Sequence, residues 1–337
     1  GALNPIPEVW QLNGTWRELS TASLEIPYYP WMFVAPDGRV FYAGWARTSR
    51  WLDTAGTGHW TATGPAHKVA VTRIYGTAVM YEPGKVLVAG GNDSPPEASA
   101  EVIDLNDKNP QWRLIAPMKH ARHHAVGTLL PDGTVLVTGG TSSPGKNDRT
   151  GSVMTPELWD PVTEQWTELA AMDVNRLYHS TALLLPDARV FTGGGGQPPA
   201  DGQPDNFNAQ IYSPPYLFND DGTPAARPQI DDAPGEIAYG APIPVSTPAP
   251  GDVAQVTLVK LGSMTHAFNQ SQRFMRLPFT ADASLITATA PANPNLAPPG
   301  HYMLFLVGRN GAPSEARIVH LQQGLVAAMP AAAAGMR

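Results

Sequence analysis

The chain has 337 residues, of which 42% are hydrophobic and 15% charged, a composition typical of a sequence that folds around a buried core. Its net charge of −7 excludes the basic footprint of a protein that binds nucleic acid or anionic lipid, and the absence of cysteine excludes disulfides, thiolate metal sites and a catalytic thiol within these residues. The 32 glycines and 35 prolines favour an all-β fold with many tight turns.

The N-terminal segment predicts strands, with no visible signal peptide or membrane span. Residues 1–7 have neither a basic start nor an apolar stretch, and no apolar run in the chain approaches the ~18 residues that a spanning helix needs. The first predicted strands are PEVWQL, at residues 7–12, and a second that opens at Trp16, with no hairpin before them. We therefore expect a first repeat that has only its outer half, and a longer protein with sequence upstream of residue 1.

The next feature is a hairpin pattern that occurs four times. Each copy has an apolar run, a turn with Pro, Asp or Gly, a β-branched run and then small residues. Asp-Gly between alternating strands is a strong hairpin signal, because glycine readily adopts a positive φ. The four copies are Trp31–Gly44, Thr77–Gly91, Val126–Gly140 and Thr181–Gly194.

Tryptophans mark the same repeat independently. At spacings of 44, 52 and 54 residues, a short strand opens at Trp16, Trp60, Trp112 and Trp166. Four strands for every ~50 residues, with Gly-Gly after the hairpin, are typical of the kelch blades of a β-propeller. Because the last hairpin is followed by one strand, AQIYS, and no tryptophan strand, we expect an incomplete propeller over residues 1–225, with three full and two partial blades.

From residue 228 the pattern changes to alternating segments that are separated by Pro and Gly turns. These segments are VAQVTLVKL, RFMRLPF, SLITATA, HYMLFLVGR and ARIVHL. They favour an antiparallel, immunoglobulin-like β-sandwich over residues 228–322. Residues 213–228 are the expected linker between the two domains, and the Ala-rich residues 323–337 are an expected low-complexity tail.

Because the chain lacks cysteine, metal chemistry would depend on histidine and carboxylate side chains. The run Arg176-Leu-Tyr-His179 leads into the last hairpin, and in kelch blades this segment opens the innermost strand, beside the central channel. The phenol of Tyr178 and the imidazole of His179 offer one oxygen and one nitrogen donor, a set suited to Cu(II). The alternative is ordinary packing of an aromatic ring and a histidine.

Two further groups of histidines could reach the same place. His266 lies in a predicted turn of the sandwich, LGSMTHAFNQSQRF, and a loop from an appended domain can reach a propeller axis. A hydrogen-bonding loop residue is the alternative for a lone histidine of this kind. His120, His123 and His124 lead into the hairpin one blade earlier. We interpret them as a polar wall of the pocket rather than as ligands, with solvated loop residues as the alternative.

These segments resemble the galactose oxidase and glyoxal oxidase family of copper-radical oxidases. RLYHSTALLLPDARVFTGGGG, continuing after an insertion as NAQIYSPPYLF, is similar to the last blade of that family. GSMTHAFNQSQRF resembles the loop with its second histidine ligand, and PPGHYMLFLVGRNGAPSEARIV resembles its final hairpin. Residues 75–91 and 121–140 resemble its middle blades, so that the resemblance covers about residues 8–322.

The resemblance implies a seven-bladed kelch propeller with one copper ion, Cu2+, on its axis. It implies that Tyr178 is the axial ligand and general base, and that His179 and His266 are the equatorial ligands. The remaining protein ligand of the family is a tyrosine cross-linked to a cysteine, which forms a radical cofactor. Both partners would belong to blades in a missing N-terminal segment of the same protein.

The implied reaction oxidises a primary alcohol or a small aldehyde with O2 and releases H2O2. Tyr75, His123 and His124 are the candidate substrate-pocket residues. Since His124 falls where galactose oxidase has an aromatic residue, a glyoxal-like aldehyde suits the pocket as well as a sugar does. The resemblance also implies a secreted, cell-surface or periplasmic location. Without the Cys-Tyr cofactor, we expect this chain alone to have little or no oxidase activity.

Two other interpretations stay open. The chain could be a non-catalytic binding or scaffold module whose kelch blades carry a vestigial metal site. It could also be a complete short propeller that closes with five blades, with the strand of Trp16 sealing the last one. A cysteine and a tyrosine at the matching positions of upstream blades would favour the enzyme.

Overall fold

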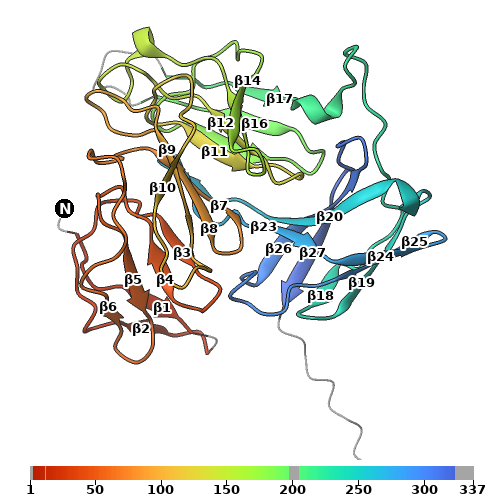
Figure 1. Cartoon of the computed structure of the whole chain (residues 1–337), viewed down its shortest axis with the longest axis horizontal. Helices are drawn as coiled ribbons and strands as arrows, with labels where there is room; N and C mark the ends of the chain where they lie inside the picture. Colours follow the sequence, from red (N-terminus) through yellow and green to blue (C-terminus); the bar gives the residue numbers. More distant parts are fainter. Residues whose placement is uncertain (1–2, 12, 197–204, 323–337) are drawn as a thin grey trace, which may run out of the picture.

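The computed structural model describes residues 3–11, 13–196 and 205–322, and within them the regular structure consists of β-strands and three short 3-10 helices (Figure 1). None of the helices in these residues could cross a membrane. The predicted tail, residues 323–337, lies outside the described residues. The all-β fold class is confirmed.

Residues 8–212 form five antiparallel sheets in chain order, which are the blades. The first sheet has two strands, β1 (Glu8–Trp10) and β2 (Trp16–Glu18). Three four-stranded sheets follow: β3 (Met32–Val34), β4 (Val40–Tyr42), β5 (Arg50–Asp53) and β6 (His59–Trp60); β7 (Thr77–Glu82), β8 (Lys85–Ala89), β9 (Ala100–Asp104) and β10 (Arg113–Ile115); β11 (Val126–Leu129), β12 (Val135–Thr138), β13 (Glu157–Asp160) and β14 (Gln165–Glu168). The fifth sheet has three strands, β15 (Thr181–Leu184), β16 (Val190–Gly193) and β17 (Ala209–Tyr212).

The four predicted hairpins are the first two strands of the last four sheets. Their turns hold a left-handed residue at one repeat position: Gly38, Gly84 and Gly133 have φ of 89°, 81° and 92°, and Ala188 takes 68° in the last copy. A side chain at such a φ is strained, which explains why glycine occupies three of the four positions. The β-branched runs after these turns supply buried strands that pack between blades.

The repeated tryptophans join successive blades. The indole nitrogen of Trp60 donates to the carbonyl of Ala22 at 2.8 Å, and that of Trp166 donates to the carbonyl of Ala116 at 2.8 Å. The indole nitrogen of Trp112, which is fully buried just before β10, donates to the hydroxyl of Ser49 at 3.1 Å. Each bond reaches back 38 to 63 residues, into or just beyond the preceding sheet.

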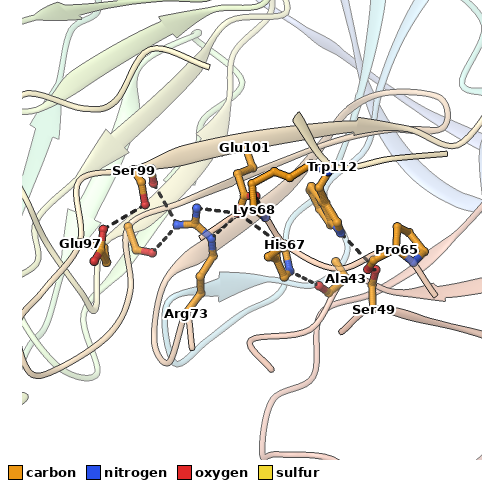
Figure 2. Close-up of polar contacts among 11 residues, drawn as sticks. Ala43, Ser49, Pro65, His67, Lys68, Arg73, Glu97, Ser99, Glu101 and Trp112 are labelled. Atoms are coloured by element: carbon orange, nitrogen blue, oxygen red, sulfur yellow. Dashed lines mark hydrogen bonds and ion pairs between the residues drawn. The ribbon is translucent and has the colours of Figure 1, made fainter. Parts of the chain in front are cut away.

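A buried ion pair ties the segment that leads into β7 to the third strand of the same blade (Figure 2). The guanidinium of Arg73 lies 2.7 Å from the carboxylate of Glu101, and both side chains are fully buried. Arg73 also donates to the carbonyls of Gly90 and Ser99, each at 2.9 Å, while His67 contacts Glu101 at 3.1 Å. The lead-in segment of the blade is therefore fixed to its own sheet.

The next two blades repeat this arrangement with one difference. In the third four-stranded sheet, Arg122 pairs with Glu157 at 2.6 Å, and both side chains are fully buried. In the three-stranded sheet, Arg176 is also buried but donates to the side-chain oxygen of Asn208 at 2.8 Å and to the carbonyl of Gly194 at 3.0 Å. Each of the three arginines therefore holds the lead-in of an inner strand.

The second domain is the expected β-sandwich. One sheet has five strands: β18 (Glu236–Ala238), β27 (Arg317–Gln322), β26 (Gly300–Gly308), β20 (Val253–Lys260) and β23 (Phe274–Leu277). The other has three: β19 (Pro242–Ser246), β25 (Leu285–Thr289) and β24 (Phe279–Asp282). The β18–β27 pair is parallel, unlike the antiparallel pairing that we expected throughout. The 3-10 helices are η1 (Arg149–Gly151), η2 (Pro215–Leu217), inside the predicted linker, and η3 (Pro250–Asp252).

A small hairpin from the sandwich packs against the blades. It consists of β21 (Met264–Thr265) and β22 (Phe268–Asn269), and the ring of Phe268 meets that of Phe33 edge to face at 5.8 Å. Just beyond it, the side chain of Gln272 accepts from the amide of Leu129 and donates to the carbonyl of Gly127, each at 2.9 Å. The side-chain amide of Gln272 thus bonds to the backbone of β11, and these two bonds anchor the hairpin to an inner strand.

The buried pair in Figure 2 generates a stability prediction. Burial alone would raise the pKa of Glu101, but its bonds to His67 and Arg73 outweigh burial and lower the pKa to about 2. Glu101→Gln leaves the Arg73 charge buried without a counter-charge, and we expect a loss of about 3 kcal/mol in the free energy of unfolding. The matched control is Glu164→Gln, which removes an exposed pair with Arg113 and should cost less than about 1 kcal/mol.

The same pair predicts a pH dependence. Since the native pKa of Glu101 lies below its ordinary value of 4.5, its contribution is complete above that value and is lost as the pH falls toward about 2. The gap in urea unfolding midpoint between the wild type and Glu101→Gln should therefore narrow from neutral pH to about pH 3. A gap that is constant over this range, or equal losses for Glu101→Gln and Glu164→Gln, would contradict the assignment.

Candidate metal and substrate site

The structure brings Tyr178, His179 and His266 together, although the two histidines are 87 residues apart. Tyr178 and His179 precede β15, and His266 lies in the turn between β21 and β22. The Nε2 atoms of His179 and His266 are 3.1 Å apart, and the Tyr178 ring centroid lies 3.8 Å from that of His179 and 5.6 Å from that of His266. His179 is exposed and His266 is half-buried, so this cluster is open to solvent.

Backbone strain is concentrated at the same place. His179 and His266 have φ of 63° and 45°, and Tyr29, Tyr75 and His124 have φ of 55°, 53° and 59°. Except for His266, each of these residues lies two positions before one of the four predicted hairpins. Non-glycine residues at positive φ are uncommon, are strained, and cluster at functional sites. The propeller therefore repeats one strained lead-in residue in four successive blades.

The rings of these lead-in residues form a continuous aromatic wall. Tyr75 stacks on His124 with ring centroids 4.1 Å apart, and both rings meet Tyr178 edge to face, at 6.1 Å and 5.1 Å. Tyr29 stacks on His266 at 3.6 Å with an angle of 10° between the rings. Our sequence analysis missed Tyr29, although its position two residues before the first predicted hairpin was a signal that could have found it.

His123 and His124 are buried, which differs from the solvated-loop alternative. Their own blade and the preceding one hold them, because the His123 backbone bridges to Thr141 of the same blade and the amide of His124 donates to the carbonyl of Tyr75 at 2.7 Å. Burial lowers the pKa of His123, and it lowers that of His124 well below its ordinary value; the pKa of His124 is lowered further because protonating both rings would place two positive charges side by side. Both imidazoles are therefore neutral at physiological pH.

The hydrogen bonds of this pair fix the tautomer of each ring. Nε2 of His123 lies 3.0 Å from the carbonyl oxygen of Ser143, so Nε2 carries the proton and Nδ1 is an acceptor. Nδ1 of His124 lies 2.7 Å from that acceptor and must be the donor. Nε2 of His124 therefore presents a lone pair, and it is buried without a hydrogen-bond partner among the described residues.

Two neighbouring side chains complete the description. His120 is not part of the cluster, because its Nε2 lies 2.7 Å from the carboxylate of Glu168 on the outer strand β14. Lys146, which our sequence analysis did not identify, places its Nζ 4.8 Å from the centroid of the Tyr178 ring. It lies in the β12–β13 loop, a segment with no repeat pattern that could have revealed it.

The donors available to a metal ion are two imidazoles and a phenol. Within residues 3–11, 13–196 and 205–322, no group of three or more His, Asp or Glu side chains is arranged to hold a metal ion. Burial lowers the pKa of His266, with further lowering by His179 and Lys146, so its ring is neutral. Burial, followed by Tyr75 and Tyr29, raises the pKa of Tyr178, so that its phenol keeps its proton at neutral pH when no metal is bound.

Family models match both domains. The model described as glyoxal oxidase N-terminus matches residues 93–216, over the blades, and the model described as galactose oxidase-like, Early set domain matches residues 227–321, over the sandwich. The two matches follow each other in the order of the two domains. The segments around Tyr178 and His266 fall in one match each.

Curated relatives carry oxidase names. The chain is 32% identical over 309 residues to galactose oxidase of Gibberella zeae, a match that covers 88% of this chain and 45% of the relative. It is 29% identical over 328 residues to aldehyde oxidase GLOX of Vitis pseudoreticulata, over 87% of this chain and 62% of that protein. The chain thus spans about half the length of these curated relatives.

A solved structure supports both the fold and the family. It is a fungal alcohol oxidase of the AA5 family in complex with copper, 30% identical in sequence. The two structures superpose with a TM-score of 0.86, over 96% of this chain and 71% of the other. The chain therefore belongs to the galactose oxidase and glyoxal oxidase family.

Proposed function

We propose that Tyr178, His179 and His266 hold a copper ion, and that this chain carries the metal- and substrate-binding part of an alcohol or aldehyde oxidase. The observation that carries the proposal is the 3.1 Å approach of two imidazole Nε2 atoms, one from each domain, beside a buried phenol. The copper in the related fungal alcohol oxidase supports the choice of metal.

The residues present fit Cu(II). Imidazole nitrogens suit copper, and a phenol oxygen adds the harder donor that Cu(II) accepts. His266 is neutral because its pKa is lowered, so a lone pair is free for a metal without loss of a proton from the ring. The left-handed backbone at His179 and His266 is the kind of strain that persists where function requires it. The ring of Tyr29, which stacks on His266, holds the plane of that imidazole.

The residues present do not fit the second redox group of the family. A tyrosine cross-linked to cysteine cannot form within this chain, because the sequence contains no cysteine. The oxidase reaction of the whole protein would need a second one-electron carrier from outside these 337 residues.

The proposed reaction oxidises a primary alcohol, RCH2OH, or a hydrated aldehyde with O2. One C–H and one O–H bond break, and two electrons and two protons pass to O2 to give H2O2. Copper, when bound, would make the substrate hydroxyl more acidic and accept one electron. Secretion or a cell-surface location also remains a proposal, and it rests on membership of the family.

The side chains of this chain would bind the substrate and receive its proton. Oη of Tyr178 is the proposed acceptor of the hydroxyl proton. It would accept as the phenolate that a bound copper ion would stabilise, because the raised pKa of the metal-free phenol keeps Oη protonated. The stacked rings of Tyr75 and His124 would form the wall against which the substrate carbon packs, and would exclude water from Tyr178.

The copper site predicts a loss of metal binding in two variants. We expect His179→Ala and His266→Ala each to weaken Cu(II) binding at least about 100-fold, because each removes a ligand rather than a supporting contact. His59→Ala, which removes an exposed ring distant in sequence from the proposed ligands, is the control and should leave Cu(II) binding unchanged. The nitrogen hyperfine pattern of the Cu(II) EPR spectrum should change from two imidazoles to one. Wild-type spectra and affinities in both variants would contradict the site.

The missing cysteine predicts the redox behaviour of this chain alone. The copper-loaded chain should have the mass that its sequence gives without a covalent cross-link. It should show no tyrosyl radical by optical or EPR spectroscopy, and it should release no peroxide with galactose or methylglyoxal. Sustained peroxide release that His266→Ala abolishes would contradict the need for a second redox group. If copper does not bind, or binds equally well to His179→Ala and His266→Ala, the non-catalytic binding module becomes the better interpretation.

A further inference from the structure

A cavity outside the proposed metal site lies where the sandwich meets the first four-stranded blade. Its volume is about 160 Å3, and it is lined by strand β3 of the blade, by the segment after strand β22 and by Pro298, in the loop before β26. Two basic side chains, those of Lys260 and Arg273, also line it. Since no carboxylate is among its lining residues in the part of the chain that the structure describes, the cavity offers a ligand two cations and no anion.

The two basic residues are direct neighbours across a pair of strands. The amide of Lys260 donates to the carbonyl of Arg273 at 2.9 Å, one position beyond the last register pair of β20 and β23, Val259 with Phe274. Like charges directly opposite each other on paired strands destabilise a sheet. Burial lowers the pKa of Lys260, and repulsion from Arg273 lowers it further. An anion bound beside both residues would offset this repulsion.

The charge of Arg273 is buried and has no counter-charge. The side chain is 5% exposed, and its Nη2 donates to the carbonyls of Val34 and Asn295, at 2.9 Å and 2.8 Å. Nη1 contacts Sδ of Met80, and Nε has no hydrogen-bond partner among the described residues. Burial lowers the pKa of Arg273 to about 10, so the guanidinium stays charged at neutral pH. Its partners are therefore neutral groups that leave the positive charge uncompensated.

The donors that a ligand could contact directly belong to Lys260 and Ser271, which are both partly exposed. Nζ of Lys260 donates to the carbonyl of Pro299 at 3.2 Å, which leaves two of its three N–H groups available. The ring of Tyr302, 6.0 Å from Nζ, brings no negative charge, because burial raises the pKa of its phenol. Lys260 can therefore contact an anion, while the charge of Arg273 attracts it from behind.

We propose that this cavity binds one small, doubly charged oxyanion, phosphate or sulfate, beside Lys260 and Arg273. Two uncompensated positive charges on neighbouring residues match the charge of a dianion, and its oxygens can accept from the ammonium group and from the hydroxyl of Ser271. Partly desolvated cations attract such an ion more strongly than exposed lysines do. The volume of the cavity admits a single ion of this size together with water.

The bound ion would stabilise the contact between the two domains. The lining residues Gln270 and Ser271 directly follow β22, and Gln272 fastens this segment to strand β11 of the blades. A ligand that binds the folded chain and not the unfolded chain raises the free energy of unfolding. Phosphate should therefore stabilise the protein from a cavity that contains none of the proposed copper ligands.

The first test measures binding of inorganic phosphate to the full, metal-free chain by calorimetric titration at constant ionic strength. Lys260→Met should weaken phosphate binding at least about ten-fold, because it removes a charge-assisted contact, and Lys260→Arg should keep it. The matched control is Lys146→Met, which removes a half-buried lysine beside the proposed metal site and should leave phosphate binding unchanged. Sulfate should displace phosphate, and chloride at the same ionic strength should not.

Three results of this titration would overturn the proposal. They are the absence of phosphate binding to the wild type, binding that survives in Lys260→Met, and displacement by chloride as readily as by sulfate. A loss of binding in Lys146→Met but not in Lys260→Met would place the ion at the metal site and would equally contradict the cavity.

The second test measures urea unfolding and shows whether each variant is folded. Without added anion, the unfolding midpoint of Lys260→Met should be no lower than that of the wild type, because the variant removes the repulsion from Arg273. Phosphate at millimolar concentration should raise the midpoints of the wild type and of Lys146→Met, but not that of Lys260→Met. An equal rise in all three proteins would indicate a general salt effect and would contradict the proposed site.

Discussion

In three of the four blades that line the site, the segment that leads into the inner strand is held in place by a buried arginine. Arg73 and Arg122 are paired with carboxylates, and Arg176 is bonded to an asparagine and to backbone carbonyls. A buried guanidinium is costly unless its donors are satisfied, so the partners of Arg73 and Arg122 specify where their segments must lie. In Arg176, by contrast, only Nη1 is bonded, and Nε and Nη2 are buried without a hydrogen-bond partner among the described residues. The residues that follow, among them Tyr75 and His124, can then hold a strained left-handed backbone that an isolated loop would relax.

The site is formed by side chains from both domains, and each domain positions its own side chains. The blades supply the wall and the pair Tyr178 and His179, while the sandwich supplies His266 through a hairpin that Gln272 fastens to strand β11. Neither domain contains both imidazoles. The contact between the domains therefore brings together the proposed ligands as well as burying apolar surface, and a change at that contact would act on the metal site from a distance.

Much of the fold could be predicted from local sequence, because turns, β-branched runs and tryptophans recur at the same positions of successive blade repeats. The site could be predicted only in part. Tyr178, His179 and His266 were found through short motifs. Tyr29 was missed although it occupies the repeated lead-in position, Lys146 lies in a loop without a pattern of its own, and the burial of His124 depends on contact with Tyr75 of the preceding blade. Three strands of the two sandwich sheets, β18, β19 and β24, were missed because they are brief or proline-rich, and long-range pairing stabilises them. The two-residue strands β21 and β22 were missed because their segment was predicted to be a turn.

We propose that residues from both domains surround a single metal ion. Anomalous diffraction at the copper absorption edge, on crystals of the copper-loaded chain, tests it most directly. We expect one strong peak about 2 Å from Nε2 of both His179 and His266 and beside the phenol of Tyr178. A peak at another histidine pair, such as the stacked rings of His301 and His320 on the sandwich, with none between His179 and His266, would contradict it.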